Sequence, residues 1–298
     1  MDGEVNVQDM RWPIDALTNR LRAVGPSRQA ELFLTIVDRL HDLVADLRPS
    51  ADDLRCILAF LTDVGHAAGA RRQEWVLLAD VIGISTLIED INADRPFGAT
   101  PNTVAGPFYR TDAPEVALGA NLSRDGKGQP LAVSGRIVDM QGVAVPGAMI
   151  EVWQANAAGL YENQEPDQQP EFNLRGKMRG LPDGRFHFGT VRPGGYGLPC
   201  DGPVGRMMGQ LGLRLARPAH LHFRVTAKGF DTLTTHVFDR ADPCIAQDAI
   251  FGVKPELLYD FKLVEHGPSE GACALEVRFV LCPADHATKT EHHEGGLL

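Results

Sequence analysis

A change of hydrophobic pattern near residue 100 limits the fold of this chain more than any other feature of its 298 residues. Before that point, apolar residues recur at spacings of three and four, which predicts amphipathic helices over about 27–47, 54–64 and 72–91. After it, short β-type runs alternate with turns rich in glycine and proline, a pattern typical of a β-sandwich. The predicted fold class is therefore α+β, with a helical part over residues 1–100 and an all-β sandwich over 101–298.

The sandwich prediction rests on a series of short runs rich in β-branched, aromatic and other apolar residues. The expected strands cover residues 131–139, 148–154, 185–191, 219–226, 232–238, 258–263 and 275–281. Glycines, prolines and asparagines separate them, as turns between strands require. From Ala284 onward the chain is mostly polar, and we expect this tail to be disordered.

The composition argues against several classes of protein. With 44% hydrophobic residues the chain can form a core, and 29 Lys and Arg against 39 Asp and Glu give a net charge of −10 that disfavours nucleic-acid binding. No apolar run reaches the roughly 20 residues of a membrane helix, and the acidic start, Met1–Glu4, is unlike a signal peptide. The five cysteines are scattered, which fits reduced thiols. We therefore expect a cytoplasmic protein that binds neither nucleic acid nor membrane.

The sharpest local motif is His220-Leu221-His222. In a strand, side chains two positions apart share one face, so both imidazoles should point the same way while Leu221 and Phe223 point to the opposite face. Two imidazoles on one strand face form half of a metal site. From the motif alone, a polar strand face without a metal is the alternative.

Two of the four tyrosines strengthen the metal interpretation. Tyr161 follows the strand expected over 148–154, and Tyr196 follows Gly194 and Gly195, where the backbone can turn tightly. Phenolate is a hard, strongly donating ligand that suits ferric iron, and a nearby Fe³⁺ would lower the pKa of a phenol from its usual value of about 10. Two phenolates and two neutral imidazoles would leave a net charge of about +1 and favour the ferric state.

Four segments taken together resemble the intradiol ring-cleaving dioxygenases, which use non-haem ferric iron. The segments are Thr100–Tyr109, Gly147–Asn156, Asp201–Gly205 and Arg217–Phe223, and the resemblance runs from the third expected helix to about Leu281. It implies cleavage of an aromatic 1,2-diol by O2 between its adjacent hydroxyls, with one Fe³⁺ per chain. It also implies homodimers formed through the helical part, where a phospholipid-like molecule is often found in an apolar tunnel.

The resemblance assigns roles to residues position by position. Tyr161, Tyr196, His220 and His222 match the four iron ligands of the family. Tyr196 would also act as a base when the diol binds, and Arg217 would stabilise negative charge that builds up on the substrate. An interior salt bridge is the alternative role for Arg217.

Two features are similar to the group of the family that cleaves hydroxyquinol (1,2,4-trihydroxybenzene). One is the segment Asp242–Pro255, and the other is the pair Leu77 and Asp80, which lie one helical turn apart. The Asp80 carboxylate would accept a hydrogen bond from the third ring hydroxyl. The expected product is 3-hydroxy-cis,cis-muconate or its tautomer maleylacetate. The alternative reaction is cleavage of catechol or substituted catechols to cis,cis-muconates. The alternative for Asp80 is a solvated position on its helix.

The resemblance also predicts the residues that line the substrate pocket. Besides Leu77 and Asp80, they are Val104, Ala105, Gly106, Pro107, Phe108, Leu198, Pro199, His236 and Ile250. Ala105 is smaller than the residue expected there in hydroxyquinol enzymes, which would widen the pocket. His236 stands where catechol relatives often carry glutamine, and it is either a hydrogen-bond donor near the iron or an ordinary strand residue.

Two other classes of function remain open from the sequence. The run Gly147–Trp153 also resembles strands of transthyretin-like binding modules, which carry no iron. A zinc hydrolase is the third alternative, although tyrosine suits zinc poorly. A visible charge-transfer band favours a ferric phenolate site, whereas a colourless, iron-free protein favours the binding module.

Overall fold

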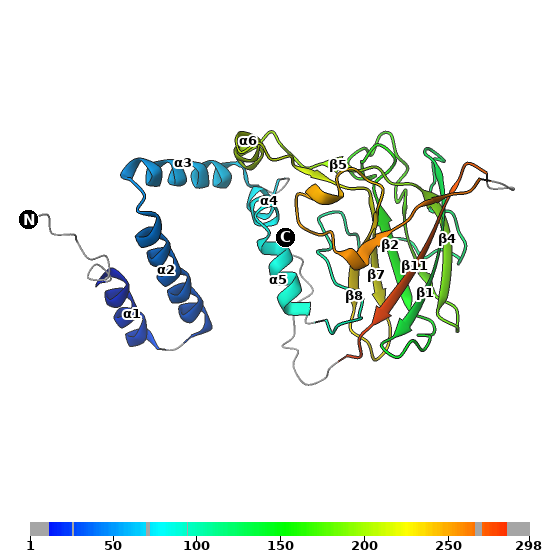
Figure 1. Ribbon diagram of the computed structural model, residues 1–298, viewed down its shortest axis with the longest axis horizontal. Helices are drawn as coiled ribbons and strands as arrows, with labels where there is room; N and C mark the ends of the chain where they lie inside the picture. The colour runs from blue at the N-terminus through cyan, green and yellow to red at the C-terminus, as the bar shows by residue number, and fades with distance from the viewer. Residues whose placement is uncertain (1–11, 26, 70–71, 94, 266–269, 285–298) are drawn as a thin grey trace, which may run out of the picture. The chain divides into compact units, whose positions relative to one another are not determined.

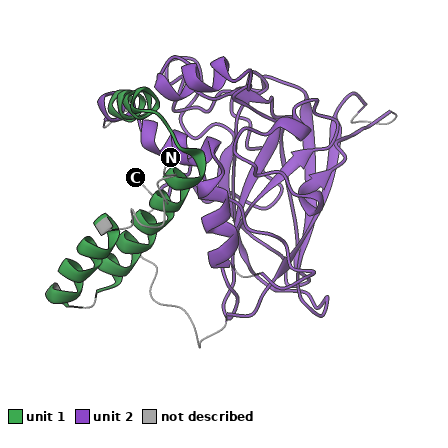
Figure 2. Ribbon diagram, turned by 60° about the vertical axis from the view of Figure 1, so that its left-hand side comes forward, with its two compact units in different colours: residues 1–63 green, residues 64–298 purple. Residues whose placement is uncertain are grey.

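Figure 1 shows a computed structural model of the chain, which describes residues 12–25, 27–69, 72–93, 95–265 and 270–284. The chain divides into two compact units, residues 1–63 and residues 64–298 (Figure 2). The domain boundary near residue 100 stays a prediction, and the tail expected to be disordered lies, except for Ala284, outside the described residues. Within those ranges, no helix is both long and apolar enough to cross a bilayer.

The first unit contains helices α1 (Trp12–Val24) and α2 (Arg28–Leu47) and most of α3 (Ala51–Ala67). Ser27 caps α2 because its side chain accepts a hydrogen bond from the backbone N–H of Ala30 at 3.1 Å. Arg48 ends the same helix in the left-handed conformation, with φ of 47°. The helices predicted over 27–47 and 54–64 are thus confirmed, whereas α1 was not predicted.

The second unit begins with a break in a segment for which the sequence predicts one helix. Instead of a single helix over 72–91, the structure has α4 (Glu74–Val81) and α5 (Ile84–Ala93). Gly83 separates them with φ of 78°, a backbone conformation that L-residues rarely adopt. A Cβ atom at Gly83 would also lie only 3.2 Å from the ring of Phe251. The prediction of one helix is wrong because tertiary packing overrides the continuous apolar pattern here.

The rest of the second unit is a sandwich of two sheets (Figure 1). One sheet has the order β10-β11-β1-β4 and the other β3-β2-β7-β8-β9, while β5 and β6 form a separate ribbon. The strands are β1 (Pro130–Asp139), β2 (Met149–Gln154), β3 (Arg175–Arg179), β4 (Arg185–Val191), β5 (Tyr196–Gly197), β6 (Ala216–Arg217), β7 (His220–Thr226), β8 (Leu233–Asp239), β9 (Leu258–Tyr259), β10 (Lys262–Leu263) and β11 (Cys273–Leu281). A short helix, α6 (Pro203–Gln210), precedes β6.

The hydrophobic core lies between the two sheets. Phe223 of β7 illustrates the packing, because its ring contacts those of Phe186 and Phe188 from β4 and of Phe279 from β11 at centroid distances of 4.9 to 6.3 Å. Leu221 and Phe223 both belong to the buried core cluster, as the strand alternation predicts. The fold class is therefore confirmed: a helical N-terminal region followed by a β-sandwich.

Most expected strands agree with the structure to within two residues, and the differences have local causes. The run predicted over 258–263 is divided between β9 and β10, which belong to different sheets. β3 was not predicted because its sequence, Arg-Gly-Lys-Met-Arg, carries three cationic residues and a glycine. Pairing with β2 nevertheless forms this strand and places Arg175 opposite Trp153.

Candidate active site

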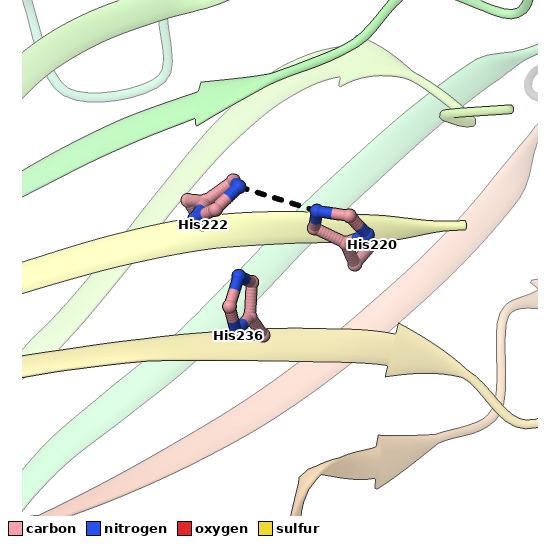
Figure 3. Close-up of side chains that lie close together, drawn as sticks. All are labelled: His220, His222 and His236. Carbon is pink, nitrogen blue, oxygen red and sulfur yellow. Dashed lines mark hydrogen bonds between the residues drawn. The ribbon is translucent and has the colours of Figure 1, made fainter. Parts of the chain in front are cut away.

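Three histidines gather on the face of the five-stranded sheet that points away from the core (Figure 3). His220 and His222 share this face of β7, as their spacing predicts, and His222 is paired with His236 of β8. The side chains of Leu221 and Val237 alternate with them and point into the core. This outer face is also buried: the three histidines are at most 2% exposed.

The ring nitrogens of these histidines converge. Nε2 of His220 lies 3.2 Å from Nε2 of His222 (Figure 3). Nδ1 of His220 lies 2.7 Å from the carbonyl oxygen of Pro218. The carbonyl fixes the hydrogen on Nδ1 of His220, so its Nε2 presents a lone pair toward His222. One ring nitrogen from each of the three histidines lies within 4.8 Å of the others. Burial lowers the pKa of all three well below 6.5, so the imidazoles are neutral, as metal ligands must be.

The two tyrosines approach the histidines from the loop after β2 and from the two-residue strand β5. Tyr161 follows β2 and is 1% exposed, whereas Tyr196 begins β5 and is half-buried. Their ring centroids are 6.0 Å apart at 83°, and the rings of Tyr196 and His220 are 5.6 Å apart. Gly159 permits this approach, because its φ is 83° and a Cβ atom there would lie 2.6 Å from the carbonyl oxygen of Gly195.

The hydroxyl of Tyr161 is a buried polar atom with no hydrogen-bond partner among the described residues. Burial, with a smaller contribution from Tyr196, raises the pKa of this phenol well above 10, against the opposing charge of Arg217. An unpartnered buried hydroxyl is costly unless something else satisfies it. Only a cation close to its oxygen would make phenolate the stable form here.

Arg217 lies between the tyrosine and histidine groups. It pairs with Tyr196 across the β5–β6 ribbon, and its Nη1 lies 3.4 Å from the Tyr196 hydroxyl and 3.3 Å from Nε2 of His220. Asp248 forms a buried ion pair with it, the Nε to Oδ1 distance being 3.1 Å. Burial opposes the charge of Arg217, yet Tyr196 and Asp248 hold its pKa above the ordinary value. The interior salt bridge that was the alternative role for Arg217 therefore exists, and it lies beside Tyr196 and His220.

These donors fit a ferric ion. Two neutral imidazole nitrogens 3.2 Å apart have the separation expected of neighbouring ligands at about 2.0–2.1 Å from one metal. A hard, trivalent cation would satisfy the unpartnered Tyr161 oxygen and stabilise it as phenolate. The indole of Trp153 stacks on the imidazole of His222, with ring centroids 4.7 Å apart and an interplanar angle of 14°. This stacking restricts the orientation of the imidazole.

The structure places several of the predicted pocket residues against this group. Phe108 stacks on Tyr161 with centroids 4.2 Å apart, and Ala105 packs on the cluster that contains Tyr161 and Trp153. Gly106 faces His222, because a Cβ atom at this glycine would lie 3.6 Å from the imidazole ring. His236 is fully buried beside both site histidines, and Ile250 is 5% exposed.

The other predicted pocket residues lie on α4 or on loops. Leu77 and Asp80 are half-buried on α4, as are Val104 and Leu198 on loops, whereas Pro107 and Pro199 are exposed. Burial raises the pKa of Asp80, while a hydrogen bond with Ser85 and the charge of Arg217 oppose that rise. Asp80 therefore lies within the electrostatic reach of the site and is not a fully solvated helix residue.

Sequence reasoning missed several residues that support the site. Trp153 was seen only as part of an apolar strand, although the period of two places it on the face opposite Val152. Asp248 lies in a segment singled out for substrate preference, but no sequence signal connects it to Arg217, 31 residues away. The buried pair of Arg175 and Glu162, 2.6 Å between Nη2 and Oε2, depends on the unpredicted strand β3.

Comparison with known proteins identifies the family to which this chain belongs. Residues 104–283 match the family model described as Dioxygenase, and residues 27–100 match the one described as Catechol dioxygenase N terminus. The chain belongs to the intradiol ring-cleavage dioxygenases, enzymes that depend on non-haem iron. This membership argues against the transthyretin-like binding module and the zinc hydrolase.

Particular relatives narrow the comparison. The chain is 46% identical over 246 residues, 83% of each chain, to a hydroxyquinol 1,2-dioxygenase from Rhizobium sp.. It is 38% identical to a 6-chlorohydroxyquinol 1,2-dioxygenase from Cupriavidus pinatubonensis, covering 90% of this chain and 95% of that one. Its structure is similar to that of a hydroxyquinol 1,2-dioxygenase from Pseudomonas putida, with a TM-score of 0.86, 34% identity, and coverage of 91% and 98% of the two chains.

Proposed function

We propose that this enzyme cleaves hydroxyquinol between its adjacent hydroxyls with O2, giving 3-hydroxy-cis,cis-muconate or its tautomer maleylacetate. Both oxygen atoms of O2 enter the product. The observation that carries the proposal is the convergence of the buried Nε2 atoms of His220 and His222, 3.2 Å apart, with two phenols and a buried arginine. The names of the relatives described above support the substrate.

In this proposal, Tyr161, Tyr196, His220 and His222 hold one Fe³⁺ per chain. A ferric ion held there would supply the Lewis acidity that activates an aromatic diol toward O2. The two histidines supply neutral nitrogens from strand β7, while Tyr161 supplies an oxygen from a loop and Tyr196 one from β5. Tyr161 is fully enclosed, so it serves as a permanent ligand.

The other side chains have distinct tasks. Tyr196, which is half-buried and 3.4 Å from Nη1 of Arg217, would take a proton from the incoming diol at its phenolate oxygen. The guanidinium of Arg217 then stabilises negative charge that develops on the substrate, because it is fixed and buried within the site. Phe108 and Ile250 line the pocket with apolar surface and exclude water.

Oxygen uptake by the purified enzyme, corrected for autoxidation, tests this function with hydroxyquinol and catechol side by side. We expect faster uptake with hydroxyquinol, and mass spectrometry with ¹⁸O₂ should find two labelled atoms in the ring-opened acid. A preference for catechol would overturn the substrate but keep the reaction. No uptake with either diol by iron-replete protein would overturn the proposed function.

In this proposal, Asp80 makes the enzyme prefer hydroxyquinol, which has a third hydroxyl, to catechol. Its carboxylate is half-buried and lies close enough to Arg217 to interact with its charge. The third hydroxyl of hydroxyquinol would donate a hydrogen bond to the Asp80 carboxylate. Plain catechol lacks this hydroxyl and would leave the carboxylate without that partner. An unmet charged hydrogen bond costs about 1.5–3 kcal/mol, or roughly 10- to 100-fold in preference.

Asp80→Ala is therefore expected to lower the ratio of kcat/KM for hydroxyquinol to kcat/KM for catechol about 10- to 100-fold. Steady-state oxygen uptake on both diols measures this. Asp63→Ala, which removes an exposed carboxylate from α3, serves as the control. Equal losses on the two substrates would remove Asp80 from the specificity argument.

We also propose that the enzyme is a homodimer formed through its N-terminal helices, with a phospholipid-like molecule bound in an apolar tunnel there. Support comes from a stripe of large apolar side chains that are 36% to 69% exposed on α2 and α3. The stripe consists of Leu32, Phe33, Ile36, Leu40, Leu43, Val44, Leu47, Leu54, Ile57, Leu58 and Leu61. Mass spectrometry of an organic extract tests for the lipid.

Leu40→Glu is expected to convert the dimer into monomers, because it places a charge in the middle of this stripe. Sedimentation velocity at micromolar concentration measures the change. The neighbouring Arg39→Gln alters a 79% exposed side chain and should leave the dimer intact. A wild-type chain that sediments as a monomer would contradict the proposed assembly.

A further inference from the structure

The Asp248 carboxylate uses both of its oxygens inside the site. Oδ1 accepts a hydrogen bond from Nε of Arg217 at 3.1 Å, and Oδ2 accepts one from the backbone N–H of Gly252 at 2.9 Å. Both side chains of the ion pair are 2% exposed. Buried charge pairs are retained at a cost in desolvation, so a pair at this place needs an explanation beyond stability.

The pair leaves the other end of the guanidinium directed at the reacting groups. Nη1 of Arg217 lies near both the Tyr196 hydroxyl and His220, while Nη2 is buried and has no hydrogen-bond partner among the described residues. Because Nε is held by Asp248, the planar guanidinium cannot rotate away from the site without breaking a charge-assisted hydrogen bond.

The segment that carries Asp248 is itself anchored. The Thr86 hydroxyl of α5 donates a hydrogen bond to the carbonyl of Ile250 at 2.6 Å, and Phe251 packs against Gly83 between α4 and α5. Gly252 lets the backbone close on the ion pair, because a Cβ atom there would lie 3.2 Å from both Nη2 of Arg217 and Oδ2 of Asp248. The segment that carries Asp248 is thus held by its contacts with α5 and Gly83 and by the close approach of Gly252 to the ion pair.

We propose that Asp248 is a positioning residue that orients the Arg217 guanidinium toward Tyr196 and the substrate. This inference rests on the proposed function, since it concerns the charge that Arg217 supplies during ring cleavage. Asp248 does not itself contact the reacting atoms. It acts by fixing where the guanidinium points.

Asp248→Asn tests the proposal, because an amide accepts a hydrogen bond at only one of its two positions and presents a donor at the other. Either Arg217 or Gly252 then faces a donor. We expect kcat for hydroxyquinol to fall about 10- to 100-fold with KM changed less than about threefold, because Arg217 acts after the diol has bound. The visible phenolate-to-iron band of the enzyme without substrate should also shift, since Nη1 of Arg217 contacts the Tyr196 oxygen.

Asp239→Asn is the matched control. Asp239 also accepts from an arginine Nε, that of Arg192 at 2.9 Å, and from a backbone N–H, that of Ala241 at 3.0 Å. Its side chain, like that of Asp248, is 2% exposed, but these bonds do not join it to Arg217, Tyr161 or Tyr196. This variant should lose stability while its absorption band and kcat stay within about twofold of the wild type.

A double-mutant cycle separates positioning from a general structural role. In an Arg217→Lys background, Asp248→Asn should change kcat less than about threefold, since the guanidinium it orients is gone. Equal effects in both backgrounds, or an Asp248→Asn enzyme that matches Asp239→Asn in band and kcat, would overturn this inference alone. A wild-type enzyme with neither the band nor oxygen uptake would overturn the proposed function and the inference together.

Discussion

Tyr161→Phe is expected to abolish most of the visible band and to lower both iron content and oxygen uptake by more than about 100-fold. Loss of a group that only supports a metal ligand typically costs about 10- to 100-fold, so loss of a ligand itself should cost more. The substitution removes a single oxygen. The ring remains free to stack on Phe108, whose centroid lies 4.2 Å away.

The same variant should not destabilise the metal-free chain. The Tyr161 hydroxyl is buried without a hydrogen-bond partner among the described residues, so its removal relieves a desolvated polar group. The thermal midpoint of the metal-free variant is therefore expected to equal or exceed that of the metal-free wild type. Tyr109→Phe, which removes a hydroxyl 3.0 Å from Glu151, is the control and should keep its iron. A coloured, active Tyr161→Phe enzyme would contradict the ligand assignment.

Glu162→Ala is expected to lower the free energy of unfolding by about 3–5 kcal/mol, because it leaves the buried charge of Arg175 without its partner. The side chains of this pair are 2% and 1% exposed. Arg175 also donates to the carbonyl oxygen of Phe108 at 2.8 Å, so its displacement should disturb both Tyr161 and the pocket wall. Urea unfolding of the metal-free protein, followed by circular dichroism, measures the loss.

Glu171→Ala is a matched control for that experiment. Glu171 contacts Arg110, which also contacts Glu162, but the Glu171 side chain is 71% exposed and its oxygen lies 3.4 Å from Nη2. An exposed ion pair contributes little, so a change below about 0.5 kcal/mol is expected. If the two variants lost equal stability, the burial of the Arg175–Glu162 pair would not be the reason for the loss.

Periodicity alone was sufficient for the parts of this structure in which local and tertiary forces agree. The period of two in β7 correctly placed His220 and His222 on one face and Phe223 on the other. Helices α2 and α3 followed from apolar spacing, whereas α1 was not predicted. Where packing decides, the pattern failed: Gly83 divides a continuous apolar run because Phe251, distant in sequence, fills the space beside it.

The residues of the candidate site could be predicted from the sequence, but the contacts that hold them in place could not. Resemblance to a family, rather than spacing, brought Tyr161 and Tyr196 together with the histidines, and their roles as ligands stay a prediction. The burial of His236 and the Asp248–Arg217 pair depend on long-range contacts. A single sequence shows that such residues exist but not which of them meet.

The alternation along β7 separates two kinds of genetic variation. Substitutions at Leu221, Phe223 and Val225 act on the packing between the sheets, whereas substitutions at His220 and His222 act on chemistry on the opposite side of the same strand. Cavities between the sheets lower stability, whereas substitutions of the histidines change which donor groups the outer face presents, in addition to their packing against Trp153. Selection can therefore act mainly on durability at one set of codons and mainly on reactivity at the codons that alternate with them.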